Sequence, residues 1–109
     1  MKSKFEVIRD RGKFIKFKDA ISGRYYLMRD YVIKLSRITD EEVFDYYSID
    51  IIDNRYFGER SCSGFNRRGK LYEATKEQIE WLEACRNAGE FIEFKNVVFS
   101  GPVAYELWD

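Results

Sequence analysis

The chain has 109 residues, with 19 basic and 19 acidic side chains and no histidine, so its formal net charge is zero. This length fits a single domain over residues 1–109, and an apolar share of 45% can build a core, which argues against a disordered chain. The lack of histidine excludes His-based triads and histidine metal sites, and the neutral total argues against a dedicated double-stranded DNA binder.

The first forty residues are predicted to form antiparallel strands. Strand-like patterns cover residues 5–8 and 13–18, separated by the turn signal Asp10-Arg11-Gly12. A longer extended segment runs from residue 24 to residue 35. We expect Arg29-Asp30 to divide this segment into two strands.

The middle of the chain is predicted to contain a short acidic helix and a loop. Thr39-Asp40-Glu41-Glu42 has the pattern of a helix capping box, and apolar residues follow it at helical spacing. We therefore predict a helix near residues 40–48, although the alternation around residues 49–51 also fits a strand. Residues 54–70 are rich in Gly, Ser, Asn and Arg and are predicted to be a loop.

The clearest helix is predicted near residues 76–87. Thr75 and Gln78 form a second capping box, and Gly89 is a C-cap signal. Strand-like runs follow at 91–95, 97–99 and 103–108. This order predicts an α+β fold, with an antiparallel sheet of about five to seven short strands and two helices, near 40–48 and 76–87.

Charge is unevenly distributed along the chain. Residues 1–38, 39–59, 60–70 and 71–109 carry net charges of +7, −6, +4 and −5. Either these blocks fold onto one another and cancel, or one face stays basic and another acidic. In the second case the molecule can bind an anionic ligand or stack head to tail with its own copies.

An anion-binding site is predicted where glycines, hydroxyl groups and basic side chains gather in the 58–70 loop, next to a basic, tyrosine-rich strand. The candidate residues are Arg24, Tyr25, Tyr26, Arg60, Ser61, Ser63, Phe65, Asn66, Arg67, Arg68 and Lys70. The arginines and Lys70 are expected to hold the anion, and the aromatic rings are expected to stack on the ligand. The alternative is a solvated basic loop beside tyrosines that pack in the core.

Two motif matches point to enzymes but lack the required context. Residues 64–70 match the P-loop pattern, yet no buried strand is expected before them and no helix directly after them. Glu93-Phe94-Lys95 matches half of a nuclease metal site, without closely spaced carboxylates. Cys62 and Cys85 are expected to be free thiols. We therefore predict a non-enzymatic protein with no cofactor and no metal.

Residues 74–92 read ATKEQIEWLEACRNAGEFI. This segment resembles one found in small accessory proteins of tailed bacteriophages, where Ala-Thr, Trp-Leu-Glu-Ala-Cys and a closing Phe-Ile recur in that order. The resemblance covers about a fifth of the chain and ends after Ile92, where the phage segment usually continues with proline. It implies a phage or prophage accessory protein, and many such proteins bind a host defence or regulatory factor.

These observations lead to one main functional hypothesis and two alternatives. The main hypothesis is an accessory protein that binds and inhibits a host protein, or sequesters its anionic nucleotide messenger. The first alternative is a self-assembling adaptor or structural phage component, and the second is a module that binds single-stranded nucleic acid. The charged N-terminus and the lack of a long apolar run predict a cytoplasmic protein, in the host cytosol if phage-encoded, with no membrane contact.

Overall fold

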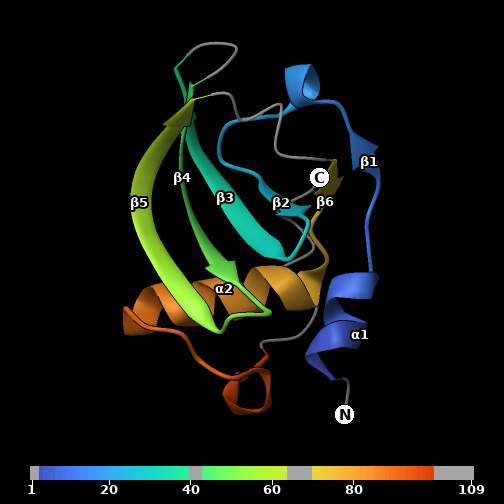
Figure 1. The fold of residues 1–109 in the computed structure, drawn as a ribbon, viewed down its shortest axis with the longest axis vertical. Coiled ribbons are helices and arrows are strands. Elements are labelled where there is room, and N and C mark those ends of the chain that lie inside the picture. Colours follow the sequence, from blue (N-terminus) through green and yellow to red (C-terminus); the bar gives the residue numbers. More distant parts are fainter. Residues whose placement is uncertain (1–2, 40–42, 64–69, 100–109) are drawn as a thin grey trace.

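Six strands and two α-helices build the part of the chain that the structure describes, residues 3–39, 43–63 and 70–99 of a computed structural model (Figure 1). In chain order the elements are α1 (Lys4–Arg9), β1 (Phe14–Ile15), the 3₁₀ turn η1 (Phe17–Asp19), β2 (Tyr25–Met28), β3 (Tyr31–Ile38), β4 (Val43–Asp50), β5 (Arg55–Ser63), β6 (Leu71–Glu73), α2 (Lys76–Ala88) and the 3₁₀ turn η3 (Phe94–Asn96). The strands form one sheet in the order β1-β6-β2-β3-β4-β5, and each pair of neighbours is antiparallel. The fold is therefore α+β, as predicted.

The sheet is buried on both faces. Helix α2 lies across one face, with α1 near its N-terminal end (Figure 1). The helix-side core consists of Val7, Tyr25, Leu27, Val32, Tyr47, Ile49, Ile51, Ala74, Ile79, Trp81, Leu82 and Cys85. The opposite-face core consists of Tyr26, Met28, Ile33, Leu35, Phe44, Tyr46 and Leu71. Successive side chains of the central strands therefore alternate between two apolar clusters, instead of between a core and solvent.

This two-sided burial explains why the predicted helix near residues 40–48 is wrong. Val43–Asp50 is strand β4, which pairs with β3 on one side and with β5 on the other. Phe44 enters the opposite-face core, whereas Tyr47 and Ile49 enter the helix-side core. Apolar residues on both faces of one strand imitate helical spacing when they are read along the sequence. The Thr39 hydroxyl donates to the Val43 carbonyl oxygen (2.9 Å) instead of capping a helix.

Three other segments also differ from prediction. Residues 5–8 lie in helix α1, which begins with a capping box formed by Ser3 and Glu6. Val7 of this helix is buried, and α1 packs against α2. Most of the expected 54–70 loop is strand β5. The strand-like runs at 91–95 and 97–99 form the single turn η3 and extended chain, and residues 103–108 lie outside the described residues. The two-residue turn at Arg29-Asp30 is confirmed between β2 and β3.

Helix α2 begins and ends as the sequence indicates. Thr75 and Gln78 cap each other, and Gly89 ends the helix with a positive φ of 71°, which costs a glycine little. Gln78 also connects the two helices. Its buried amide nitrogen donates to the carbonyl oxygens of Val7 (2.8 Å) and Asp10 (2.7 Å), while its amide oxygen accepts from the Thr75 N–H (3.0 Å).

We predict that Gln78→Glu destabilises the protein by about 3 kcal/mol, because a carboxylate cannot donate and would lie against two buried carbonyl oxygens. Chemical denaturation of the purified variant measures this loss. Asn87→Asp is the matched control, since it makes the same chemical change at an exposed position of the same helix and should cost less than about 1 kcal/mol. Equal losses for the two variants would contradict a linking role for Gln78.

Candidate functional site

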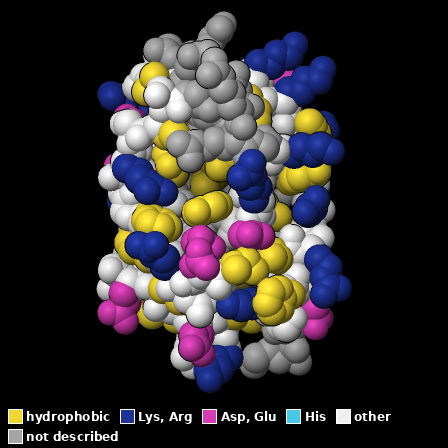
Figure 2. Space-filling model, in the orientation of Figure 1, with side chains coloured by type: hydrophobic (Ala, Val, Ile, Leu, Met, Phe, Trp, Pro, Cys, Tyr) yellow, Lys and Arg dark blue, Asp and Glu magenta, His cyan; other side chains and the backbone are white. Residues whose placement is uncertain are grey.

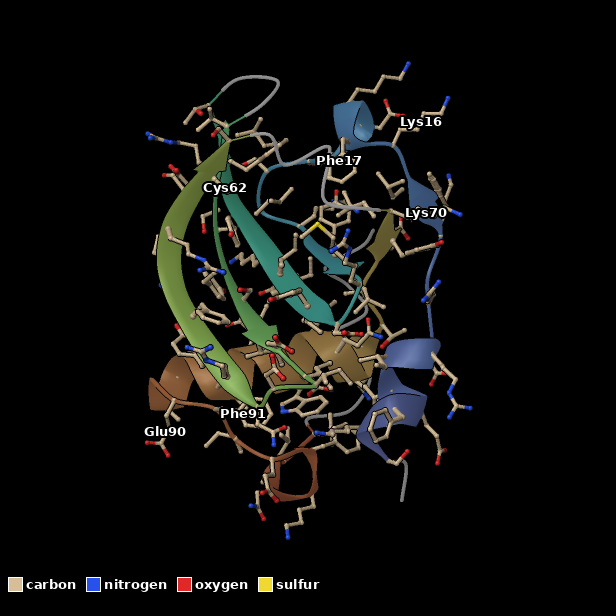
Figure 3. The ribbon with its side chains drawn as sticks, in the orientation of Figure 1. Lys16, Phe17, Cys62, Lys70, Glu90 and Phe91 are labelled. Atoms are coloured by element: carbon tan, nitrogen blue, oxygen red, sulfur yellow. The ribbon has the colours of Figure 1, made fainter. Side chains whose placement is uncertain are left out.

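The predicted anion-binding residues that the structure describes do not lie together. Arg60, Ser61 and Ser63 lie on β5 at one edge of the sheet, whereas Lys70 precedes β6 near the other edge. Figure 3 shows this separation, with Cys62 of β5 and Lys70 on opposite sides of the sheet. Arg24 precedes β2 and is partly buried, and its carbonyl oxygen accepts from the Leu35 N–H (3.0 Å). Phe65, Asn66, Arg67 and Arg68 lie outside the described residues.

The tyrosines of β2 are not available for stacking on a ligand at the surface. Tyr25 is 6% exposed and Tyr26 is 1% exposed, so their rings belong to the helix-side and opposite-face cores. The Tyr26 hydroxyl accepts a hydrogen bond from the Ile21 N–H (2.9 Å). This part of the prediction needs correction, because β2 is a central strand and both of its faces are covered.

Tyr25 instead takes part in a polar cluster between the sheet and α2. The hydroxyl groups of Tyr25 and Tyr47 both donate to the same oxygen of Glu83, at 2.6 and 2.5 Å. Lys34 lies between the two tyrosines in the strand register, and its ammonium group is 5.4 and 5.8 Å from their ring centroids. The Arg86 guanidinium lies 4.3 Å from the Tyr47 ring centroid. Two cations therefore lie against the tyrosine rings that bind Glu83, and the cluster connects α2 with the sheet.

Burial and the nearby Glu83 carboxylate raise the pKa of both Tyr25 and Tyr47 well above the ordinary value of about 10. A neutral hydroxyl donates to the carboxylate, whereas a tyrosinate next to it would add a second negative charge. The two tyrosines are therefore kept protonated as donors, which suits a structural connection.

The exposed candidate site is a set of arginines stacked on aromatic rings along β5. The Arg60 guanidinium lies 4.3 Å from the Phe57 ring centroid and 5.3 Å from that of Tyr46. The Arg55 guanidinium lies 5.2 Å from the centroid of the same Phe57 ring. The Tyr31 ring is next to Phe57, with centroids 6.5 Å apart. We call Arg55, Phe57, Arg60 and Tyr46 the β5 ladder.

A bulge in β5 creates this ladder. Tyr46 pairs with Arg60 and Ser48 pairs with Phe57, so β5 has one more residue than β4 between these two pairs. Phe57 and Arg60 are three residues apart and would point to opposite faces of a regular strand. The extra residue in the Gly58-Glu59 segment returns Arg60 to the face that carries Phe57.

The two guanidinium groups of the ladder stack on aromatic rings and form no direct ion pair, although Asp50 is opposite Arg55 in the strand register. Within residues 3–39, 43–63 and 70–99, neither Arg55 nor Arg60 has a hydrogen-bond acceptor or an ion-pair partner. By contrast, Arg37 is paired with Asp45 (3.1 Å), which also accepts from the Ser61 hydroxyl. Stacking covers the face of a guanidinium and leaves the N–H groups at its edge able to bind carboxylate or phosphate.

Arg60 was predicted from the sequence, but Arg55 and Phe57 were not. The segment from residue 55 to residue 63 carries Arg, Glu, Gly and Ser and therefore resembles a loop. The adjacent aromatic residues Tyr56 and Phe57 were the one strand signal that could have revealed the ladder.

The face of the molecule seen in Figure 2 carries mixed charge. In Figure 2, Lys and Arg side chains are spread among hydrophobic and acidic ones, and they do not form one continuous basic face. Glu93 and Lys95, half of the metal motif, form an exposed ion pair with each other (3.4 Å). Among the described residues, no three Cys, Asp or Glu side chains lie close enough together to hold a metal ion, and neither helix is long and apolar enough to cross a membrane.

We predict that stability falls as the pH rises above about 10, because the unfolded chain then loses tyrosine protons that Tyr25 and Tyr47 retain in the folded state. Each retained proton makes the free energy of unfolding fall by up to about 1.4 kcal/mol per pH unit. Urea denaturation between pH 9 and 11 measures the slope, which should be shallower in Tyr47→Phe than in the wild type. The same slope in both proteins would contradict the assignment.

Comparisons with known proteins add no assignment for this site. No protein-family model, curated protein or solved structure matches the chain.

Proposed function

We propose that this chain is a non-catalytic accessory protein, of the kind made by tailed bacteriophages, that binds and inhibits an acidic host protein through the β5 ladder. The observation that carries the proposal is the pair Arg55 and Arg60, which are stacked on one phenylalanine and have no acidic partner among the described residues. The phage origin comes from the resemblance at residues 74–92.

The chemistry of the ladder favours a protein partner. Arginine and aromatic side chains are enriched among the residues that contribute most to protein–protein binding. A guanidinium that is already stacked loses less conformational freedom when it binds than a freely rotating side chain does. A partner that presents carboxylates at the ladder would supply the acceptors that both arginines lack.

The position of the ladder also favours a partner with an extended segment. Strand β5 is at the edge of the described sheet and extends over nine residues, Arg55–Ser63. An extended segment can pair with the backbone of an edge strand while its side chains contact the neighbouring ladder. The bulge interrupts β5 near Gly58 and divides this edge into two shorter stretches, which limits pairing with unrelated strands.

We predict that the double variant Arg55→Ala/Arg60→Ala captures at most about 10% of the host protein that the wild type captures from a bacterial lysate, because both carboxylate-binding groups are removed. Quantitative mass spectrometry of the captured proteins measures the loss. Capture by the wild type should also weaken as salt is raised from about 0.1 to 0.5 M, since charge pairing at an exposed site is screened.

Arg37→Ala/Lys18→Ala is the matched control, because it removes the same charge from exposed positions outside the ladder and should leave capture unchanged. Arg55→Lys/Arg60→Lys keeps the charge but not the planar group that stacks on Phe57, so we expect capture between those of the wild type and the alanine variant. If the alanine variant captures the same proteins as the wild type, the proposal is wrong.

A further inference from the structure

A second basic site lies between α1 and the β2–β3 turn, away from the ladder residues. It is a groove of about 250 Å³, lined by Phe5, Ile8 and Arg9 of α1, by Arg11 just beyond the helix, and by Arg29 and Asp30 of the turn. Three arginines and one aspartate thus line a small hollow together with Phe5 and Ile8. The sequence analysis selected none of these residues as a binding site.

The arginines of the groove are not neutralised by neighbouring residues. In the described part of the chain, neither Arg9 nor Arg29 has an ion-pair partner or a hydrogen-bond acceptor for its guanidinium group. Arg11 lies with its guanidinium 4.9 Å from the Tyr72 ring centroid, and this stacking fixes the group at the groove. The lining therefore keeps an excess of positive charge that a phosphate group can balance.

The backbone conformation of Arg29 favours glycine, so the arginine at this position contributes through its side chain. Arg29 has a φ of 56°, a left-handed value that is uncommon for any residue except glycine. It is the first residue of a two-residue hairpin turn, a position where glycine is the usual choice when φ is positive. An arginine at this position adds a basic residue to the groove lining at the expense of backbone strain.

The remaining lining residues supply the other groups that a nucleoside phosphate needs. Phe5 is 51% exposed and the Lys4 ammonium lies 5.6 Å from its ring centroid, so the exposed part of the ring is the aromatic surface on which a base can stack. The Asp30 carboxylate can accept hydrogen bonds from ribose hydroxyl groups, as acidic residues do in dinucleotide-binding folds. A volume of about 250 Å³ is below the usual range of ligand pockets, roughly 300–1,000 Å³, and suits a mononucleotide that stays partly exposed.

We propose that this groove binds a nucleoside monophosphate, with the phosphate on Arg9, Arg11 and Arg29 and the base against Phe5. The inference is independent of the β5 ladder, which involves different residues and a different class of partner. It gives the protein a small-molecule site in addition to the proposed interaction with a host protein.

Isothermal titration calorimetry with adenosine monophosphate tests the proposal, with adenosine and inorganic phosphate as separate titrants. The wild type should bind the monophosphate saturably and more tightly than either part alone. Arg29→Gly should raise the Kd about tenfold or more, because a charge-assisted hydrogen-bonding group is lost. Glycine suits the positive φ, so the melting temperature of this variant should not fall, and weaker binding cannot then be attributed to unfolding.

Phe5→Ser should weaken binding of the monophosphate but not of inorganic phosphate, since it removes only the stacking surface. Arg37→Ala and Arg55→Ala/Arg60→Ala are controls that should bind the monophosphate as the wild type does. Three results would overturn the proposal: no saturable binding by the wild type, equal affinity in Arg29→Gly, or adenosine binding as tightly as its monophosphate. Loss of host-protein capture in the ladder variant has no bearing on these outcomes.

Discussion

The contact of Glu83 with Tyr25 and Tyr47 is the interaction on which the rest of the structure depends. It ties one carboxylate oxygen of α2 to two strands of the sheet, with Lys34 between the two rings. Once α2 is held there, its other side chains can organise the segments around it. Gln78 fixes α1 near the N-terminal end of α2, and the Trp81 indole N–H, from the middle of the helix, donates to the Ile92 carbonyl oxygen (2.5 Å). Helix α2 thus organises much of the described fold through three polar side chains set among its apolar contacts.

Covering both faces of the sheet determines where charged groups can lie. The central strands β2, β3 and β4 place most of their side chains in one core or the other, so the described arginines of the two candidate sites that lack acidic partners are found at the edge strand, in α1 and near a turn. Arg55 and Arg60 lie on β5, and Arg29 lies in the β2–β3 turn. At these positions a guanidinium can remain hydrated on its edges while its face or stem packs on the protein. The neutral total charge of the chain gives no indication of this arrangement.

The sequence predicted the features that depend on local chemistry. The caps of α2 at Thr75 and Gly89 and the turn at Arg29-Asp30 each follow from a few adjacent residues. Strand β4 was missed because its two apolar faces are filled by residues distant in the chain, and α1 was missed because its stability depends on packing against α2.

At the candidate site, Arg60 was found from its charge. Its stacking on Phe57 depends on a bulge in the pairing with β4, which no local pattern in β5 reveals. The Trp-Leu-Glu-Ala-Cys run of residues 81–85 has structural roles in the core and in the polar cluster, so the resemblance there bears on origin more than on chemistry.

The same contacts that build the fold also hold the groove in place. Lys4 of α1 donates to the Ile52 carbonyl oxygen (3.1 Å) and to the Asn54 side chain (3.3 Å), and the Ile51 N–H donates to the Asp30 carbonyl oxygen (3.0 Å). The turn after β4 therefore connects α1 with the β2–β3 turn, which are the two walls of the groove. Because α1 is also fixed to α2 through Gln78, the separation of these walls is set before any ligand arrives. A site held in this way loses little conformational entropy on binding, so a small ligand can gain useful affinity from a few charged contacts.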